Sequence, residues 1–267
     1  GGLQSTLTTT ATSRRPLQDQ PCEWRAAVGR PESLARRLNL TIEHICILWY
    51  HICMLLRETL VTVLAAPAVF PPPPVEVPRR LVDSLPRAVG PALVLTGVRR
   101  CGKSTLQQQL CRRDRRPAVF CNLEDTRLYG LGPDDFPTLL SVLDERHTGA
   151  TVYLDEVQET PDWQRLVRAL LDAGRQVCVT GSNASLLGRE LGAKLTGRHV
   201  SVEVNPFSYH EYLAFCEGER GATTLKRYLE EGGFPGALRE AVAGPALLRE
   251  LLRDIVQRDI VSRHKVR

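Results

Sequence analysis

The sequence has no long apolar run. Its longest unbroken apolar stretch is Ile45–Tyr50, far shorter than the ~18–20 residues that a membrane-spanning helix needs. Residues 59–75 carry no charge, but five prolines interrupt them. The sequence therefore predicts no membrane span and no membrane partner.

No two of the eight cysteines show the C-x-x-C spacing. This is typical of an intracellular protein with reduced thiols, and we expect a cytoplasmic location. His44, Cys46, His51 and Cys53 suggest metal ligands, but on a helix residues 44 and 46 point in nearly opposite directions. Metal binding by this group is therefore the weaker interpretation.

Lysine and methionine are scarce. Only Lys103, Lys194, Lys226 and Lys265 are lysines among 35 basic residues, and the net charge is a mild +5. The arginine excess favours a coding bias, with arginine-rich phosphate binding as the alternative. Since the only methionine is Met54, we expect either a fragment or a start of translation near that residue.

Composition divides the chain into four parts. Residues 1–66 are predicted to be a disordered or non-native leader, with one candidate helix over 41–66. Residues 67–78 hold six prolines and predict an extended linker. Residues 79–205 alternate between strand and helix patterns, and residues 206–267 are helical. We expect a core over residues 79–205 followed by a small helical lid that is truncated at its C-terminal end.

The core pattern predicts an α/β fold with a five-stranded, mostly parallel sheet that helices cover on both faces. The expected strands are Ala92–Leu95, Ala118–Asn122, Thr151–Leu154, Gln176–Thr180 and His199–Val204. The expected helices are Arg79–Leu85, Lys103–Arg113, Phe136–Arg146, a helix capped by Thr160 that ends at Gly174, Ala184–Leu195, Tyr209–Cys216, Thr224–Glu231 and Pro245–Val261.

One motif lies between the first strand and the following helix. It fits G-x-x-x-x-G-K-[ST] and consists of Gly97, Val98, Arg99, Arg100, Cys101, Gly102, Lys103 and Ser104. The glycines let successive amides face one centre, and the helix N-terminus adds positive potential. Lys103 would reach the β- and γ-phosphates of ATP, and Ser104 would coordinate Mg²⁺. The motif predicts a P-loop NTPase.

Two acids, Asp155 and Glu156, end the third apolar strand. Carboxylates at the carboxyl end of a parallel strand project into the crevice where such sheets bind ligands. We expect Asp155 to hold Mg²⁺ and Glu156 to polarise the attacking water. Glu124 and Asp125 follow the second strand and either line the same crevice or cap a loop.

Three further positions have open alternatives. If the sheet places the strand before Ser182 and Asn183 between the other two, these residues come near the γ-phosphate; otherwise they cap a helix. Arg198 either reaches the nucleotide of a neighbouring subunit in a homo-oligomer or is a surface arginine, and Lys194 is a weaker candidate for that task. Within the loop, Cys101 either simply fills space or has a thiolate favoured by the amide field, in which case oxidation could block nucleotide binding. Arg99 and Arg100 either contact phosphates or are solvated.

The motifs GVRRCGKST, NLED, YLDEVQE, VTGSNASLL, KLTGR, GGFP and RDIVQRDIV occur here in the order seen in a widespread group of predicted prokaryotic ATPases. Over residues 78–267 the chain resembles this group, which belongs to the AAA superfamily. The resemblance implies Gly97–Ser104 with Thr105 as Walker A and Asp155 and Glu156 as Walker B. It further implies Ser182 and Asn183 as the sensor and Arg198 as the finger. The family's usual C-terminal domain, often likened to a DNA-binding or nuclease-like module, is not present in residues 1–267.

The leading hypothesis is Mg²⁺-dependent ATP hydrolysis that drives a conformational switch on an unknown partner. The alternative is a nucleotide-dependent binding switch, or a DNA-associated regulator, with little intrinsic hydrolysis. A GTPase is disfavoured because the chain has no N-K-x-D motif. A small-molecule kinase shares the P-loop but usually lacks a glutamate beside the Mg²⁺ acid. DNA binding stays open, although residues 81–267 show no concentrated basic stripe.

Overall fold

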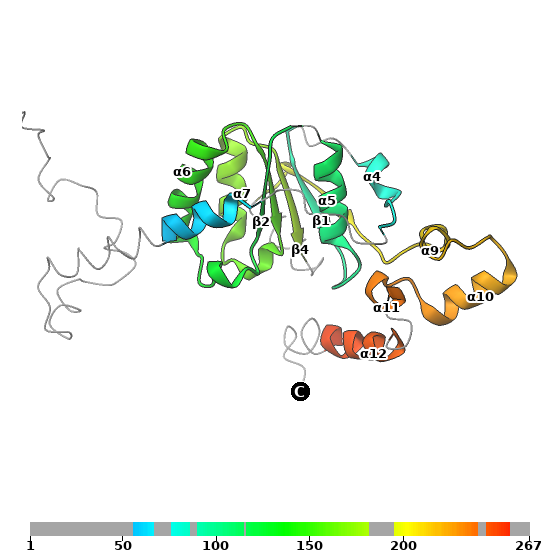
Figure 1. Cartoon of the computed structure of the whole chain (residues 1–267). Coiled ribbons are helices and arrows are strands. Elements are labelled where there is room, and N and C mark those ends of the chain that lie inside the picture. The colour runs from blue at the N-terminus through cyan, green and yellow to red at the C-terminus, as the bar shows by residue number, and fades with distance from the viewer. Residues whose placement is uncertain are drawn as a thin grey trace, which may run out of the picture. The chain divides into compact units, whose positions relative to one another are not determined.

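The computed structural model describes residues 56–66, 76–85, 90–114, 116–181, 195–239 and 244–256. The chain divides into two units, Gly1–Cys53 and Met54–Arg267, and every described residue belongs to the second (Figure 1). The strands are β1 (Ala92–Thr96), β2 (Ala118–Asn122), β3 (Thr151–Asp155), β4 (Val177–Gly181) and β5 (His199–Glu203). The α-helices are α4 (Leu81–Ser84), α5 (Lys103–Arg113), α6 (Phe136–Arg146), α7 (Trp163–Asp172), α9 (Tyr209–Phe215), α10 (Ala222–Glu231), α11 (Pro235–Arg239) and α12 (Gly244–Asp254). Short 3₁₀ turns are η2 (Thr126–Leu128), η3 (Pro133–Asp135) and η4 (Val157–Glu159).

The five strands form one sheet in the order β2-β3-β4-β1-β5, and every neighbouring pair is parallel. The predicted α/β fold is thus confirmed. β4 lies between β3 and β1. The chain ends of these three strands therefore adjoin at the carboxyl edge of the sheet, where doubly wound folds bind ligands.

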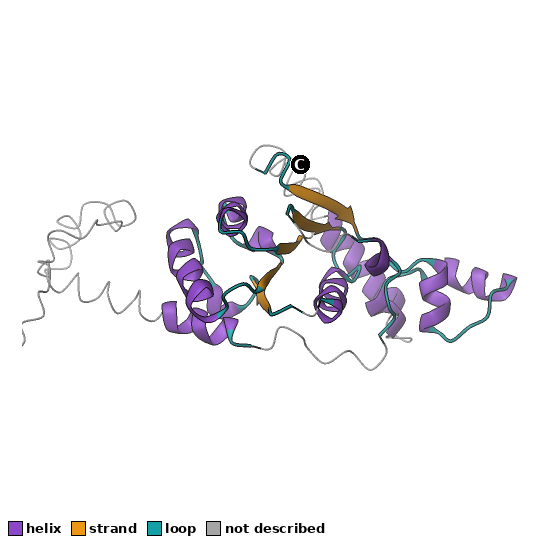
Figure 2. Cartoon of the chain, turned by 90° about the horizontal axis from the view of Figure 1, so that it is seen from above, coloured by secondary structure: helices purple, strands orange, loops and turns teal. Residues whose placement is uncertain are grey.

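Alternation along the strands buries apolar side chains on both faces of the sheet. Leu93 and Leu95 of β1 belong to a core cluster with α5, whereas Ala92 and Val94 belong to a second cluster with α6 and α7. Figure 2 shows helices on both sides of the strands. Because β1, β3 and β4 are buried throughout, the edge that carries the site has a rigid base.

Part of the expected leader packs on this sheet. Residues 56–64 are helical, and Leu60 and Leu64 are 0% and 2% exposed within the α6–α7 cluster. Arg57 of this helix pairs with Glu145 of α6. Residues 56–64 are thus not disordered, and they form part of the candidate helix predicted over 41–66. Residues 1–55 of the leader lie outside the described residues.

The end of the expected linker is also part of the packed unit. Val77 is buried, and Glu76 pairs with Arg112 of α5. The expectation of an extended linker up to residue 78 is wrong for these residues, because they pack against α5. Residues 67–75 lie outside the described part of the chain.

Helix boundaries mostly follow the predicted pattern, with one wrong start. Thr160 does not cap α7; it ends η4 instead, and α7 begins at Trp163 after Asp162, whose φ is +52°. The chain uses Pro161 and Asp162 in a turn, because η4 directly follows β3 and leaves no room for an earlier start. The predicted end near Gly174 is confirmed, since the helix stops at Asp172.

The described residues after β5 are helical, as predicted, and they include the unpredicted short helix α11. The predicted helix Ala184–Leu195 lies almost wholly outside the described residues, as does the final helix beyond residue 256. Among the described residues, no helix is both long enough and apolar enough to cross a membrane.

Candidate functional site: a phosphate loop with two carboxylates

The loop between β1 and α5 depends on two glycines. Gly97 has a φ of +150°, and a Cβ placed on it would lie 2.2 Å from the Val204 carbonyl oxygen. That carbonyl cannot retreat, because the Val204 amide donates to Thr96 O at 2.7 Å and continues the pairing of β5 with β1. Gly102 has a φ of +101° and immediately precedes α5. Side chains are therefore excluded or strained at both motif glycines.

Lys103 begins α5 and folds back into the loop. Its side chain is only 3% exposed, and its ammonium donates to the carbonyl oxygens of Gly97 and Val98, both at 3.2 Å. No side-chain oxygen caps the N-terminus of α5. The first turn of this helix thus offers amides, its dipole and a cation at one point, which suits an anionic ligand.

Asp155 at the end of β3 is buried and held by two hydroxyl groups. Thr180 of β4 donates to Oδ1 of Asp155, and Ser104 also hydrogen-bonds this carboxylate. Burial raises the pKa of the Asp155 carboxyl above its usual value, although both hydrogen bonds and Lys103 oppose the rise. The predicted pair of Ser104 and Asp155 is therefore brought together.

Glu156 adopts a left-handed backbone conformation, with a φ of +53°. Its amide donates to Thr180 Oγ1 at 3.0 Å, and its Oε2 accepts from Gln158 Nε2 at 2.6 Å. Its Oε1 lies 4.0 Å from Lys103 Nζ. Two carboxylates and one ammonium group thus converge at the carboxyl edge of neighbouring strands.

Thr180 is a site residue that the sequence analysis missed. Its fully buried hydroxyl accepts from the Glu156 amide and donates to Asp155, so it orients both acids. The available signal was a hydroxyl group in an otherwise apolar strand. Threonine is common in strands because it is β-branched, so its presence there did not indicate a site residue. Gln107 of α5 was also missed; it donates to the carbonyls of Leu154 and Cys178 and ties α5 to β3 and β4.

The two acids after β2 have different roles. Glu124 lies 3.8 Å from Arg99 of the loop, so it lines the crevice. Burial, followed by the nearby charges of Glu156 and Glu159, raises the pKa of Glu124. Asp125 instead caps η2 by accepting from the Arg127 amide. Of the two predicted alternatives, lining the crevice therefore holds for Glu124 and capping a loop holds for Asp125.

The remaining loop residues differ in exposure. Val98 and Arg100 are exposed, and Arg100 has a φ of +63°. Cys101 is fully buried, and burial raises the pKa of its thiol although Lys103 and Arg79 oppose this. The thiolate alternative is therefore wrong, because desolvation outweighs the positive surroundings. Thr105 lies in the first turn of α5, partly buried.

Arg198 lies at the other edge of the sheet. It immediately precedes β5, and its carbonyl accepts from the amide of Ala92, the first residue of β1. Its side chain is 51% exposed and pairs with Asp172 of α7. Five-residue strands separate it from the loop by roughly 16 Å, so only a neighbouring copy could use it as a finger. Ser182, Asn183 and Lys194 lie outside the described residues.

The donors present fit a magnesium–phosphate group. Among the described residues, no cluster of three or more His, Cys, Asp or Glu side chains could hold a metal ion by itself. Ser104 and Asp155 supply two oxygen donors, so Mg²⁺ would need further oxygens from phosphate and water. This is the usual way in which proteins hold that ion.

Comparison with known families places this site in context. Residues 89–213 match the AAA domain family, and the match contains the loop, both acids and Thr180. Over these residues the chain is similar to the AAA superfamily of P-loop ATPases. The predicted resemblance is thereby confirmed for the domain that carries the site.

Two curated relatives of this AAA domain are uncharacterized. One, from Methanocaldococcus jannaschii, is 31% identical over 188 residues, which are 65% of this chain and 43% of the relative. The other, from Haemophilus influenzae, is 28% identical over 190 residues, or 65% and 47%. The chain thus matches less than half the length of either. Among solved structures, a Walker-type ATPase of Pyrococcus abyssi aligns with a TM-score of 0.45 at 17% identity, covering 66% of this chain and 71% of that one.

Proposed function

We propose that the AAA domain binds ATP with Mg²⁺ and hydrolyses it, and that this cycle changes how the helical residues engage a partner. One observation carries the proposal. The Lys103 ammonium and the carboxylates of Asp155 and Glu156 converge beside a glycine-shaped loop, at the edge formed by β1, β4 and β3. A cation, a buried acid with a hydroxyl partner and a second acid are the groups that phosphoryl transfer to water requires.

Each residue then has a distinct task. Lys103 would exchange its two carbonyl acceptors for phosphate oxygens. Ser104 and Asp155 would hold Mg²⁺, which when bound neutralises charge on the phosphates. Glu156 would accept the proton of the attacking water, with Thr180 fixing its backbone.

Phosphate release tests this proposal. Wild type, Glu156→Gln and Lys103→Ala are compared with Mg²⁺ and with EDTA, at several protein concentrations, beside the exposed controls Glu230→Gln and Lys226→Ala. We expect Glu156→Gln to bind ATP but hydrolyse it at least about a hundredfold more slowly, and Lys103→Ala to lose binding. Equal turnover by wild type and Glu156→Gln would refute hydrolysis at this site, and unchanged ATP affinity in Lys103→Ala would refute the site itself.

A slow binding switch is the second candidate, favoured by the contacts of Glu156. Its Oε2 accepts from Gln158 Nε2 at 2.6 Å and its Oε1 lies 4.0 Å from Lys103 Nζ, so the carboxylate is held by side chains of the protein. Under this function Gln158→Ala would speed hydrolysis. A rise of specific activity with protein concentration that Arg198→Ala abolishes would add a homo-oligomer with an arginine acting in trans.

A further inference from the structure

A second buried cation lies next to the phosphate loop. Arg79 precedes α4, and its Nε lies 3.0 Å from Glu211 Oε1 of α9, with side chains 5% and 7% exposed. Buried ion pairs are costly unless their remaining hydrogen-bonding groups are satisfied. Here Arg79 Nη1 donates to the Cys101 carbonyl at 3.0 Å and Nη2 to the Asn205 carbonyl at 2.5 Å.

Glu211 completes the other half of this junction. Its Oε2 accepts from the amide and the hydroxyl of Ser208, both at 2.9 Å, which caps α9. Its Oε1 also accepts from the Arg80 amide at 3.3 Å. One ion pair thus joins three segments that are distant in sequence: the residues before α4, the phosphate loop and the start of the helical region.

The helical region also approaches the loop directly. A Cβ on Gly102 would lie 3.2 Å from Arg79 Nη1 and 4.0 Å from Pro235 Cγ of α11. The Arg79 guanidinium lies over the Phe207 ring, 5.2 Å from its centroid. The Phe207 amide donates to Gly233 O at 2.7 Å, and the Phe207 carbonyl accepts from Tyr228 of α10 at 2.9 Å. A shift at the loop is therefore transmitted to α9, α10 and α11 through few contacts.

We propose that Arg79 is a positioning residue that couples the conformation of the phosphate loop at Cys101 and Gly102 to the helical residues 205–239. The inference rests on the proposed function, because it takes ATP as the ligand that moves the loop. Such coupling is reciprocal: if ATP changes the helical residues, the helical residues change the affinity for ATP by the same factor.

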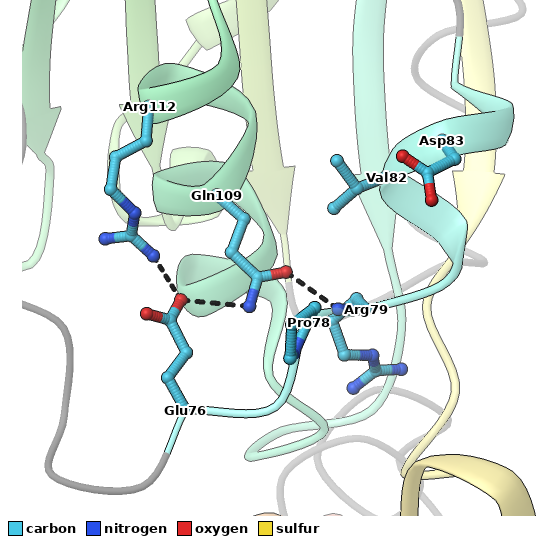
Figure 3. Close-up of a pocket in the computed structure, with 7 residues that line it drawn as sticks. All are labelled: Glu76, Pro78, Arg79, Val82, Asp83, Gln109 and Arg112. Atoms are coloured by element: carbon cyan, nitrogen blue, oxygen red, sulfur yellow. Dashed lines mark hydrogen bonds and ion pairs between the residues drawn. The ribbon is translucent and has the colours of Figure 1, made fainter. Parts of the chain in front are cut away.

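The chain offers a matched control at the same segment. Arg112 of α5 pairs with Glu76, and Gln109 links Glu76 to the Arg79 amide; these residues line a surface cavity of about 260 Å³ (Figure 3). Arg112→Ala thus removes an arginine that holds the same segment, through Glu76.

Hydrogen exchange measured by mass spectrometry with and without saturating Mg²⁺-ATP tests the coupling. In wild type and Arg112→Ala, we expect ATP to change the protection of the 205–216 amides. In Arg79→Ala that change is lost at saturation, and ATP affinity falls by about tenfold, within the range of coupled sites. Arg79→Lys keeps the positive charge but lacks the planar guanidinium with its several donors, so it restores only part of the response.

Glu211→Gln gives the same answer if Arg79→Ala fails to fold, because it keeps oxygen and shape but removes the ionic partner. A wild-type ATP response in Arg79→Ala or in Glu211→Gln would overturn the coupling. Loss of the response in Arg112→Ala would also overturn it, since tethering of the segment would then suffice. Absence of ATP binding by wild type, measured separately, would refute the proposed function along with the coupling.

Discussion

Two buried cations flank the same loop, and their surroundings differ. Lys103 donates to two carbonyls at 3.2 Å and has its nearest carboxylate at 4.0 Å. Arg79 has a carboxylate at 3.0 Å, two carbonyl acceptors and an aromatic ring. The first cation can exchange its partners for a ligand, whereas the second is held by a carboxylate, two carbonyls and a ring of the protein. The comparison indicates that the cation with few partners in the protein serves ligand binding, whereas the cation with many partners serves coupling.

The strongest way to break this comparison is to remove each cation in turn. We expect Arg79→Met to destabilise the protein by about 3–5 kcal/mol, because it leaves Glu211 as an uncompensated buried charge. Lys103→Met should cost less, because the loss of two hydrogen bonds is offset by removing a buried ammonium group that has no carboxylate within hydrogen-bond distance, while ATP binding is lost. Denaturant unfolding measures both. Equal stability losses would show that the two cations are structurally equivalent.

A second change separates orientation from binding. Thr180→Val removes a hydroxyl that contacts both acids while keeping the buried volume. A hydrogen bond to a charged group contributes about 1.5–3 kcal/mol, so we expect hydrolysis to fall roughly 10- to 100-fold. ATP affinity in EDTA should stay the same, because Lys103 and the loop are untouched.

Thr151→Val is the matched control, since it makes the same change at a buried threonine that begins β3, at the opposite end of that strand from Asp155. Steady-state phosphate release and equilibrium ATP binding are measured on both variants. A Thr180→Val enzyme with full activity would remove Thr180 from the site.

The loop was predictable and the Arg79 junction was not. The P-loop and its flanking strand and helix lie within residues 92–113, so motif and periodicity indicate them together. Asp155 and Glu156 follow an apolar strand, a pattern that is also local. Arg79 and Glu211 are separated by 132 positions, and nothing in either local sequence marks a buried partner. Only the path of the chain after β5 brings them together.

Backbone conformation explains the other errors. Glu156 and Asp162 both adopt positive φ, which is uncommon outside glycine. The residue types therefore did not predict the turn after which α7 begins. For Cys101, the thiolate alternative was wrong for a different reason. Its burial comes from packing within the core cluster that contains Leu93, Leu95 and residues of α5, and tertiary packing is not visible in the eight residues of the motif.

A smaller effect tests the charge of Asp155 through pH. Burial raises the pKa of this carboxyl in the folded state above its unfolded value near 3.8. The folded protein then binds more protons than the unfolded chain between the two pKa values, so stability decreases as the pH rises through that window. Asp155→Asn cannot ionise and lacks this loss.

Thermal unfolding of wild type and Asp155→Asn from about pH 4 to 8, which spans roughly zero to four units above the pKa of an ordinary aspartate, measures the effect. We expect the variant to gain stability relative to wild type as the pH rises, and then to keep a constant difference. Because the Asp155 charge contributes to the raised pKa of Glu124, both proteins carry Glu124→Gln in this comparison. A difference that does not change with pH would show that Asp155 titrates normally.

The smallest expected effect concerns Cys101, whose thiol interacts electrostatically with both Lys103 and Arg79. Because its thiol is fully buried and its pKa is raised, we expect slow alkylation by iodoacetamide in the native protein. Cys216 is only partly buried and should react first among the described cysteines, as peptide mapping by mass spectrometry would show.

Cys101→Ala should leave ATP binding unchanged within about twofold, since the loop uses the Cys101 backbone rather than its sulfur. Rapid loss of ATP binding on oxidation that Cys101→Ala prevents would instead restore a redox role for this thiol, and would mean that the field of Lys103 and Arg79 overcomes desolvation.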